Sequence, residues 1–139
     1  STVFSIVTDG PVLSNGKWFH VAAMYDGLRG SAKIYIDGKL SKQESADPGV
    51  FLSRDWSKYA GIGEFGGRGR LEGFIDEFYI YNKTLAEAEL KALIQKCQGP
   101  KSTMVLHLSF DKKSGTQFLD DSGLMNHARM PGPPAVPGQ

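Results

Sequence analysis

LEGFIDEFYIYNKTLAEAEL, residues 71–90, predicts a β-strand that leads directly into an α-helix. If residues 74–81 are extended, their side chains alternate between two faces, one of which carries Phe74, Asp76, Phe78 and Ile80. Asp76 therefore falls in an otherwise apolar row. Because an unpaired carboxylate is costly to remove from water, the pattern predicts that Asp76 is held by a hydrogen-bond donor, a cation or a metal ion.

The second half of this stretch carries the signals of a helix start. Thr84 is followed three residues later by Glu87, a capping-box spacing that predicts a helix over residues 85–96. Its apolar stripe, which should lie on a sheet, consists of Ala86, Leu90, Leu93, Ile94 and Cys97. Cys97 is the one cysteine of the chain, so it is either a buried free thiol or half of a disulfide to a partner outside this sequence.

The remaining sequence favours strands. Seventeen glycines and seven prolines separate short runs rich in Val, Ile, Phe and Tyr, as is typical of all-β domains. Strands are predicted over residues 2–8, 18–25, 32–36, 50–52, 59–63 and 73–81, and a further strand is predicted to begin at Met104. Turns are predicted at Asn15-Gly16, Asp37-Gly38 and Asp47-Pro48-Gly49.

Composition excludes two classes of partner. A net charge of +1 argues against a globally basic nucleic-acid binder. No apolar run approaches the length that spans a bilayer, so we expect no membrane insertion of this segment.

Four ordered motifs give a family resemblance. WFHVAAMYDG (18–27), AKIYIDGKLS (32–41), YAGIGEF (59–65) and GFIDEFYIYNKTLAEAEL (73–90) resemble the laminin-G-like, concanavalin-A-like jelly-roll superfamily, and within it the pentraxin-related group. The resemblance covers most of residues 1–95. It implies an all-β fold, an antiparallel jelly-roll sandwich with one short helix. The alanine-rich TLAEAEL segment departs from the more polar family pattern without affecting that fold assignment.

A second match has an unexpected position. VLHLSFDKKSGTQFLDDSGLMNHARM, residues 105–130, resembles the beginning of the same family, although it follows the family's end. The chain either straddles two tandem modules, which would make neighbouring modules its partners, or is circularly permuted. We expect residues 1–97 to form the C-terminal part of one module, 98–103 a linker, 104–130 the N-terminal strands of a second or permuted module, and 131–139 a proline-rich extended tail.

The resemblance also implies a candidate structural calcium site. In relatives an Asp of the last strand helps to hold calcium, which prefers oxygen ligands. The candidate ligands here are Asp76 and the oxygens of a glycine-containing turn, Asp120, Asp121 and Asn126. The alternative is that Asp120 and Asp121 make turns with their own backbone, while Asp76 pairs with His20 or Arg70.

Two surface features suit a secreted or cell-surface protein. The glycine-rich stretch GEFGGRGRLEG, residues 63–73, and its neighbours carry cations that could bind a sulfated or otherwise anionic glycan, namely Arg54, Lys58, Arg68 and Arg70; the alternative is an ordinary solvated loop. Asn82-Lys83-Thr84 is an N-glycosylation sequon with Asn82 as acceptor.

No catalytic motif is present. The sequence has no Gly-x-Ser-x-Gly, His-Glu-x-x-His or phosphate-loop spacing, and Asp76 and Glu77 should point to opposite faces of one strand. We therefore expect no enzyme activity, but a non-catalytic extracellular interaction or adhesion module that binds a protein or glycan ligand. The alternatives are a carbohydrate-binding module appended to an enzyme elsewhere in the chain, and a structural spacer in a modular protein.

Overall fold

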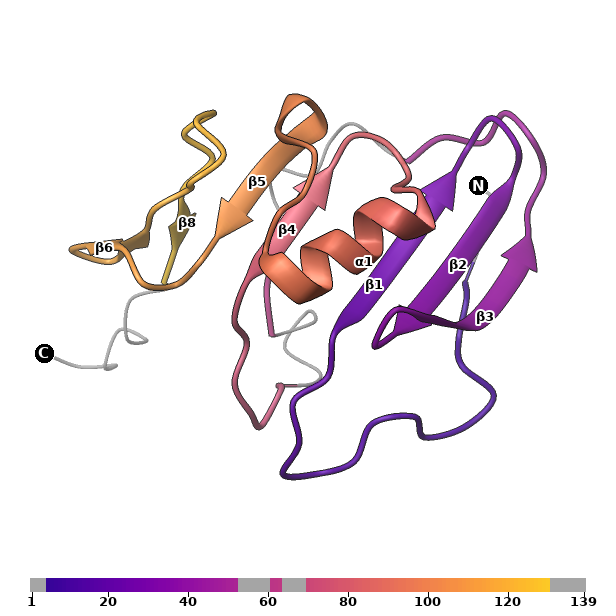
Figure 1. The fold of residues 1–139 in the computed structure, drawn as a ribbon, viewed down its shortest axis with the longest axis horizontal. Coiled ribbons are helices and arrows are strands. Elements are labelled where there is room, and N and C mark those ends of the chain that lie inside the picture. Colours follow the sequence, from indigo (N-terminus) through magenta and orange to yellow (C-terminus); the bar gives the residue numbers. More distant parts are fainter. Residues whose placement is uncertain (1–4, 53–60, 64–69, 131–139) are drawn as a thin grey trace, which may run out of the picture. The chain divides into compact units, whose positions relative to one another are not determined.

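Antiparallel sheets and one α-helix make up most of the regular structure (Figure 1). The computed structural model describes residues 5–52, 61–63 and 70–130. The antiparallel sheets confirm the all-β assignment and are consistent with a β-sandwich, although the described residues do not form a complete jelly roll. No helix among them is long and apolar enough to cross a membrane. The chain divides into two interleaved compact units: unit 1 comprises residues 1–60 and 83–100, and unit 2 comprises residues 61–82 and 101–139.

Unit 1 contains a three-stranded antiparallel sheet in the order β1-β2-β3. Its strands are β1 (Val21–Asp26), β2 (Ser31–Ile36) and β3 (Lys39–Ser45). The predicted Asp37-Gly38 turn joins β2 to β3, and both of its residues have positive φ, 49° and 75°, as a tight two-residue hairpin requires. Because this signal is local, it could be predicted from the dipeptide alone.

Helix α1 (Glu87–Lys96) also belongs to unit 1 and begins two residues later than predicted. Its N-cap is Ala86, whose N–H donates to the Glu89 carboxylate at 2.8 Å. The predicted Thr84–Glu87 cap is wrong because Glu89, also paired with Lys83 at 2.8 Å, fixes the later start. The buried side chains of the helix are Leu90 and Leu93, both members of the predicted stripe.

Cys97 ends α1 and is exposed, so of the two alternatives the buried thiol is wrong, and a disulfide to a partner outside this sequence stays a prediction. The residue adopts a left-handed φ of 50°, and its N–H bonds to the Leu93 carbonyl, which turns the chain away from the helix axis at this point. The helical spacing used to assign Cys97 to the stripe no longer applies there.

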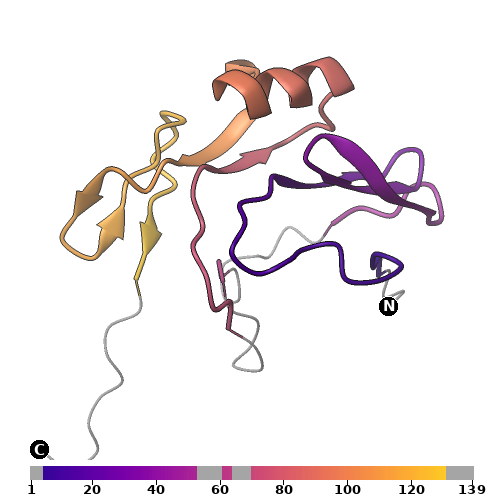
Figure 2. The same cartoon turned by 60° about the horizontal axis from the view of Figure 1, so that its bottom comes forward.

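Unit 2 pairs β4 (Phe78–Tyr81) with β5 (Met104–Leu108), which follows a 3-10 turn at Lys101–Thr103. Strand β5 begins at Met104, as predicted. A small sheet of β6 (Lys113–Ser114), β7 (Gln117–Phe118) and β8 (Ala128–Arg129) completes the regular structure of this unit (Figure 2). Strand β4 precedes the expected 98–103 linker, and β5 follows it. Because β4 pairs with β5, the segments on the two sides of the linker share one sheet. The modular assignment of these segments stays a prediction.

Strand β4 is shorter than predicted, which removes the apolar row expected around Asp76. Glu77 has a positive φ of 54°, so the extended alternation begins only at Phe78. Phe74 is 86% exposed and Asp76 is exposed as well. The interpretation of Asp76 as a buried strand residue is therefore wrong, and its carboxylate is free to be solvated.

Other predicted strands are absent from the described residues. Residues 5–8, 50–52 and 61–63 have no strand, while the rest of the predicted 2–8 and 59–63 strands lies outside the described residues. The predicted strand at 18–25 forms over Val21–Asp26 instead.

Candidate functional site

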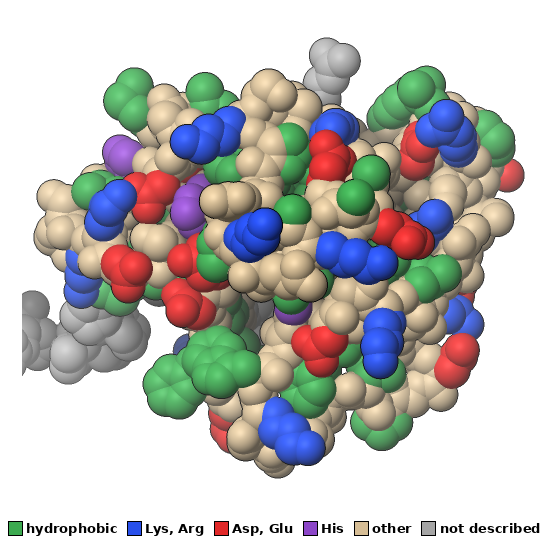
Figure 3. Space-filling view, in the orientation of Figure 1, with side chains coloured by type: hydrophobic (Ala, Val, Ile, Leu, Met, Phe, Trp, Pro, Cys, Tyr) green, Lys and Arg blue, Asp and Glu red, His purple; other side chains and the backbone are tan. Residues whose placement is uncertain are grey.

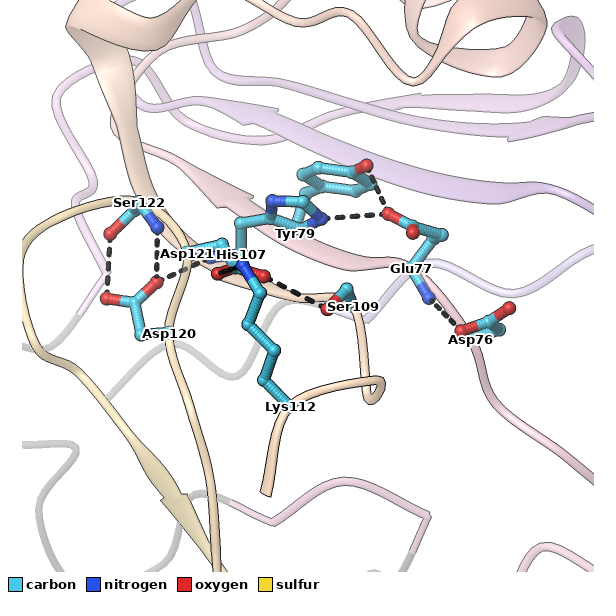
Figure 4. A network of polar contacts seen from close by, with 9 residues as sticks. All are labelled: Asp76, Glu77, Tyr79, His107, Ser109, Lys112, Asp120, Asp121 and Ser122. Carbon is cyan, nitrogen blue, oxygen red and sulfur yellow. Dashed lines mark hydrogen bonds and ion pairs between the residues drawn. The ribbon is translucent and has the colours of Figure 1, made fainter. Parts of the chain in front are cut away.

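A network of polar side chains in unit 2 contains most of the predicted calcium ligands. It links β4, β5 and the turn at residues 120–126 (Figure 4). The antiparallel register places Tyr79 opposite His107, and their rings stack with centroids 4.3 Å apart. Strand pairing therefore positions the first part of the network.

Glu77 joins Tyr79 and His107 through its carboxylate. The Tyr79 hydroxyl donates to Glu77 Oε2, and His107 Nε2 lies 2.8 Å from the same oxygen. Partial burial raises the pKa of Glu77, but the hydrogen bonds from Tyr79 and His107 outweigh it, so the pKa is lowered overall. The group is partly open to solvent, since 35% of the Glu77 side chain is exposed.

Asp120 is the buried centre of the second part. Its carboxylate accepts the N–H of His107 at 2.9 Å, both the N–H and the hydroxyl of Ser122 at 2.8 and 2.7 Å, and the N–H of Asn126 at 2.9 Å. The Asn126 side-chain amide donates to the Val105 carbonyl at 2.9 Å. Burial raises the pKa of Asp120, but these donors lower it further than burial raises it. The turn is thereby fixed to β5.

Asp121 engages the remaining hydroxyl of the network. Its carboxylate accepts the Ser109 hydroxyl at 3.0 Å and the Lys112 ammonium at 2.6 Å. The Lys112 hydrogen bond is the main cause of the lowered pKa of Asp121. Ser109 thus donates to a carboxylate, while the Nε2 of His107 faces Glu77. The Ser109 hydroxyl is therefore hydrogen-bonded to a carboxylate and not to a histidine base.

The four predicted calcium ligands do not converge. Asp76 lies on the far side of Glu77 from Asp120 (Figure 4), and its carboxylate accepts the Glu77 N–H at 3.1 Å. The oxygens of Asp120 and Asp121 already face N–H, O–H and ammonium donors, whereas calcium needs oxygens that face a common point. In residues 5–52, 61–63 and 70–130, no group of three or more His, Cys, Asp and Glu could hold a metal ion. Calcium binding stays a prediction, and this arrangement favours the alternative without it.

Most of the predicted anionic-glycan patch cannot be placed. Arg54, Lys58 and Arg68 lie outside the described residues, and Arg70 is exposed. On the face shown in Figure 3, cationic and anionic side chains are interspersed. Asn82, the predicted glycosylation acceptor, is exposed, and its backbone N–H bonds to the Thr103 carbonyl at 3.0 Å. Both assignments stay predictions.

His20, which is an expected partner of Asp76, has a hydrogen bond within unit 1. Its N–H donates to the Asp37 carboxylate at 2.8 Å, next to the β2–β3 turn. Burial lowers the pKa of His20, and the charge of Asp37 opposes this effect. Asp76 accepts the N–H of Glu77, and its expected pairing with His20 or Arg70 stays a prediction.

Unit 1 has a groove that sequence reasoning missed. Its volume is about 210 Å³, and it is lined by Met24, Asp26, Arg29, Ser31, Lys33, Tyr35, Thr84 and Leu85. The register of β1 and β2 explains the lining, because Met24 pairs with Lys33 and Asp26 with Ser31 on one face of the sheet. The alternating residues on either side of the DGLRG turn, residues 26–30, could have indicated the part of the lining that the two strands supply. The approach of Thr84 and Leu85 is a long-range contact, which local sequence does not specify.

Part of the groove is internally paired. The Asp26 carboxylate accepts the Arg29 guanidinium at 2.8 Å and the N–H groups of Leu28 and Arg29 at 3.1 Å. The hydrogen bond from the Arg29 side chain is the main reason that the pKa of Asp26 is lowered. These contacts hold the turn between β1 and β2 at one end of the groove.

Comparison with known proteins places most of the chain in one family. A family model described as the concanavalin A-like lectin/glucanases superfamily, Laminin_G_3, matches residues 1–91. No curated protein matches the chain. Among solved structures, the 2.1 Å crystal structure of an S-layer domain-containing protein (residues 221–444) from Clostridium thermocellum ATCC 27405 matches with 28% identity and a TM-score of 0.48. The match covers 64% of this chain and 44% of that chain, so less than half of the neighbour is represented.

Proposed function

We propose that this chain, which belongs to the concanavalin A-like lectin/glucanase superfamily, is a non-catalytic binding module of an extracellular protein. Its ligand is a glycan or a protein, and the groove of unit 1 favours a glycan. The observation that carries this proposal is the composition of the groove, in which apolar side chains and hydrogen-bonding groups line one concave surface.

The groove has the mixture of surfaces that ligand sites use. Met24, Tyr35 and Leu85 provide apolar surface, and Ser31 and Thr84 provide hydroxyl groups around it. Tyr35 is only 4% exposed, so its position is held by packing before any ligand arrives. The volume of about 210 Å³ is below the range of about 300–1,000 Å³ typical of drug-sized ligands. It suits a single sugar residue of a longer chain.

The polar network of unit 2 supports a non-catalytic role. A hydroxyl nucleophile needs a base within hydrogen-bond reach. Ser109 instead donates to Asp121, and His107 Nε2 is engaged with Glu77. The hydrogen bonds of Asp120 fix the turn to β5, which is a structural task. The exposed sequon at Asn82 supports an extracellular location.

A glycan array tests the proposal. We expect the purified chain to bind a subset of glycans, and Thr84→Trp to abolish that binding by filling the rim of the groove. Gln95→Trp is the matched control, because Gln95 is an exposed residue of α1 that does not line the groove. Undiminished binding by Thr84→Trp would exclude the groove as the site, and a parent chain that binds no glycan would contradict the glycan form of the proposal.

A further inference from the structure

We infer that Lys33 makes the groove selective for a carboxylate-bearing sugar residue, such as a uronic acid. This inference rests on the proposed glycan-binding function of the same groove. Its basis is the position of one lysine in the lining of the groove, among neighbours whose charges are already paired.

Lys33 occupies the middle of the sheet. It lies in β2, opposite Met24 of β1 on one side and Gln43 of β3 on the other, and it is half-buried. Within the described part of the chain, no carboxylate lies within 4.0 Å of its ammonium group. An ammonium group that lines a groove without a counter-ion is favourably placed to bind an anion.

The acid that lines the groove, and two acids on neighbouring elements, have cationic partners of their own. Asp26, which shares the groove, pairs with Arg29 at 2.8 Å. Glu44 of β3 lies 3.8 Å from Lys42, and Glu89 at the start of α1 pairs with Lys83 at 2.8 Å. Two cations and one carboxylate line the groove, so its lining carries a formal charge of +1, which is that of Lys33.

A sugar acid matches the whole lining. Its carboxylate would meet the Lys33 ammonium in a charge-assisted hydrogen bond. The C–H face of its ring would lie on Met24 and Leu85, with the nearly buried Tyr35 beneath them, and its hydroxyls would reach Ser31 and Thr84. Lysine is a compact point charge, so one lysine suits one carboxylate per residue, whereas recognition of dense sulfation usually uses several arginines.

The test uses uronic-acid oligosaccharides and the same oligosaccharides with methyl-esterified carboxylates. In calorimetric titrations we expect the parent chain to bind the acid form about tenfold or more tightly than the ester, since a hydrogen bond to a charged group is lost. Lys33→Gln should lose the same factor for the acid form. Lys33→Arg should retain it, and Lys91→Gln, an exposed lysine of α1, should bind like the parent.

Equal affinity of the parent for acid and ester would overturn the inference while leaving glycan binding intact. Unchanged binding of the acid by a folded Lys33→Gln would also overturn it. The comparison of acid with ester uses the parent chain, so it decides the matter even if Lys33→Gln does not fold. A parent chain that binds neither form, and no other glycan, overturns the inference together with the proposed glycan function.

Discussion

Asp120 accepts hydrogen bonds from His107, Ser122 and Asn126 and is only 8% exposed. Asp120→Asn replaces one acceptor oxygen with an NH2 group that faces N–H or O–H donors. We expect a loss of about 1–3 kcal/mol in the free energy of unfolding, because a buried donor is left without an acceptor. Urea denaturation measures it. Asp111→Asn is the control, since Asp111 is exposed; identical midpoints for both variants would remove Asp120 from the stability of unit 2.

The acid side chains of unit 2 also predict how stability depends on pH. The pKa values of Glu77, Asp120 and Asp121 are lowered in the fold from ordinary values of 4.5 for Glu and 3.8 for Asp. A lowered carboxyl pKa stabilises the fold fully above the unfolded pKa, and this contribution is lost as pH falls through the folded pKa. These three groups should therefore make the urea midpoint fall below about pH 4.5. The lowered pKa of His20 adds a decline that begins near its ordinary value of 6.5.

Asp120→Asn provides the comparison for the pH series. With one of the three carboxyl groups removed, its midpoint should fall less steeply with acid than that of the parent. A parent midpoint that rises between pH 4.5 and pH 3 would contradict the lowered pKa values, because a carboxyl group with a raised folded pKa gives that sign.

Asp76 and the turn at residues 120–126 illustrate what can be predicted at this scale. The alternation of residues 74–81 predicts a buried Asp76. The strand begins only at Phe78, because Glu77 has a positive φ, and no residue type in the pattern predicts that φ. The turn at residues 120–126 was predicted as a source of oxygens. Its contact with the His107 N–H depends on how β5 lies beside it, which local sequence does not specify.

At the scale of elements, local signals were the reliable ones. The Asp37-Gly38 hairpin and the start of β5 at Met104 were predicted from turn residues and breaks that act within a few positions. The helix was predicted with the correct buried pair, Leu90 and Leu93, but with the wrong cap. Thr84 and Glu87 satisfy the capping-box pattern, whereas Glu89 follows Ala86, which has no capping side chain. The bonds of Glu89 to the Ala86 N–H and to Lys83 appear only in three dimensions.

Leu93→Ala tests the packing of α1. Leu93 is 6% exposed, so removal of its side chain should cost about 2–5 kcal/mol in the free energy of unfolding. Cys97→Ser is the matched variant, because Cys97 was predicted on the same stripe but is exposed; it should change stability little. Denaturation midpoints give both values, and equal effects of the two substitutions would show that the helix does not pack as described.

At the scale of the whole molecule, the two units interleave along the chain. Strand β4 pairs with β5, although helix α1 lies between them in the sequence. Composition and motifs were sufficient for the all-β class and the family, since both depend on the sum of many local patterns. The pairing of segments on either side of residues 83–100 is a long-range property. The choice between tandem modules and a permuted module therefore stays a prediction that the sequence motifs motivate.

Calcium provides a test at the same scale. Because Asp120 and Asp121 already accept hydrogen-bond donors, we expect the parent melting temperature to be the same with excess calcium and with a chelator. A ligand that binds only the folded state would raise it by mass action. Asp76→Asn is measured in parallel. A calcium-dependent rise in the parent that disappears in Asp76→Asn would establish the metal site and contradict the expectation.

We propose that the ligand binds in the groove of unit 1 while the polar network of unit 2 maintains structure. Amide chemical shifts of the labelled chain, titrated with the glycan that binds most tightly on the array, test it most directly. We expect shift changes around residues 24–26, 31–35 and 84–85, where the groove is lined. Changes confined to Glu77, His107 and residues 120–126, with the groove amides unmoved, would contradict it.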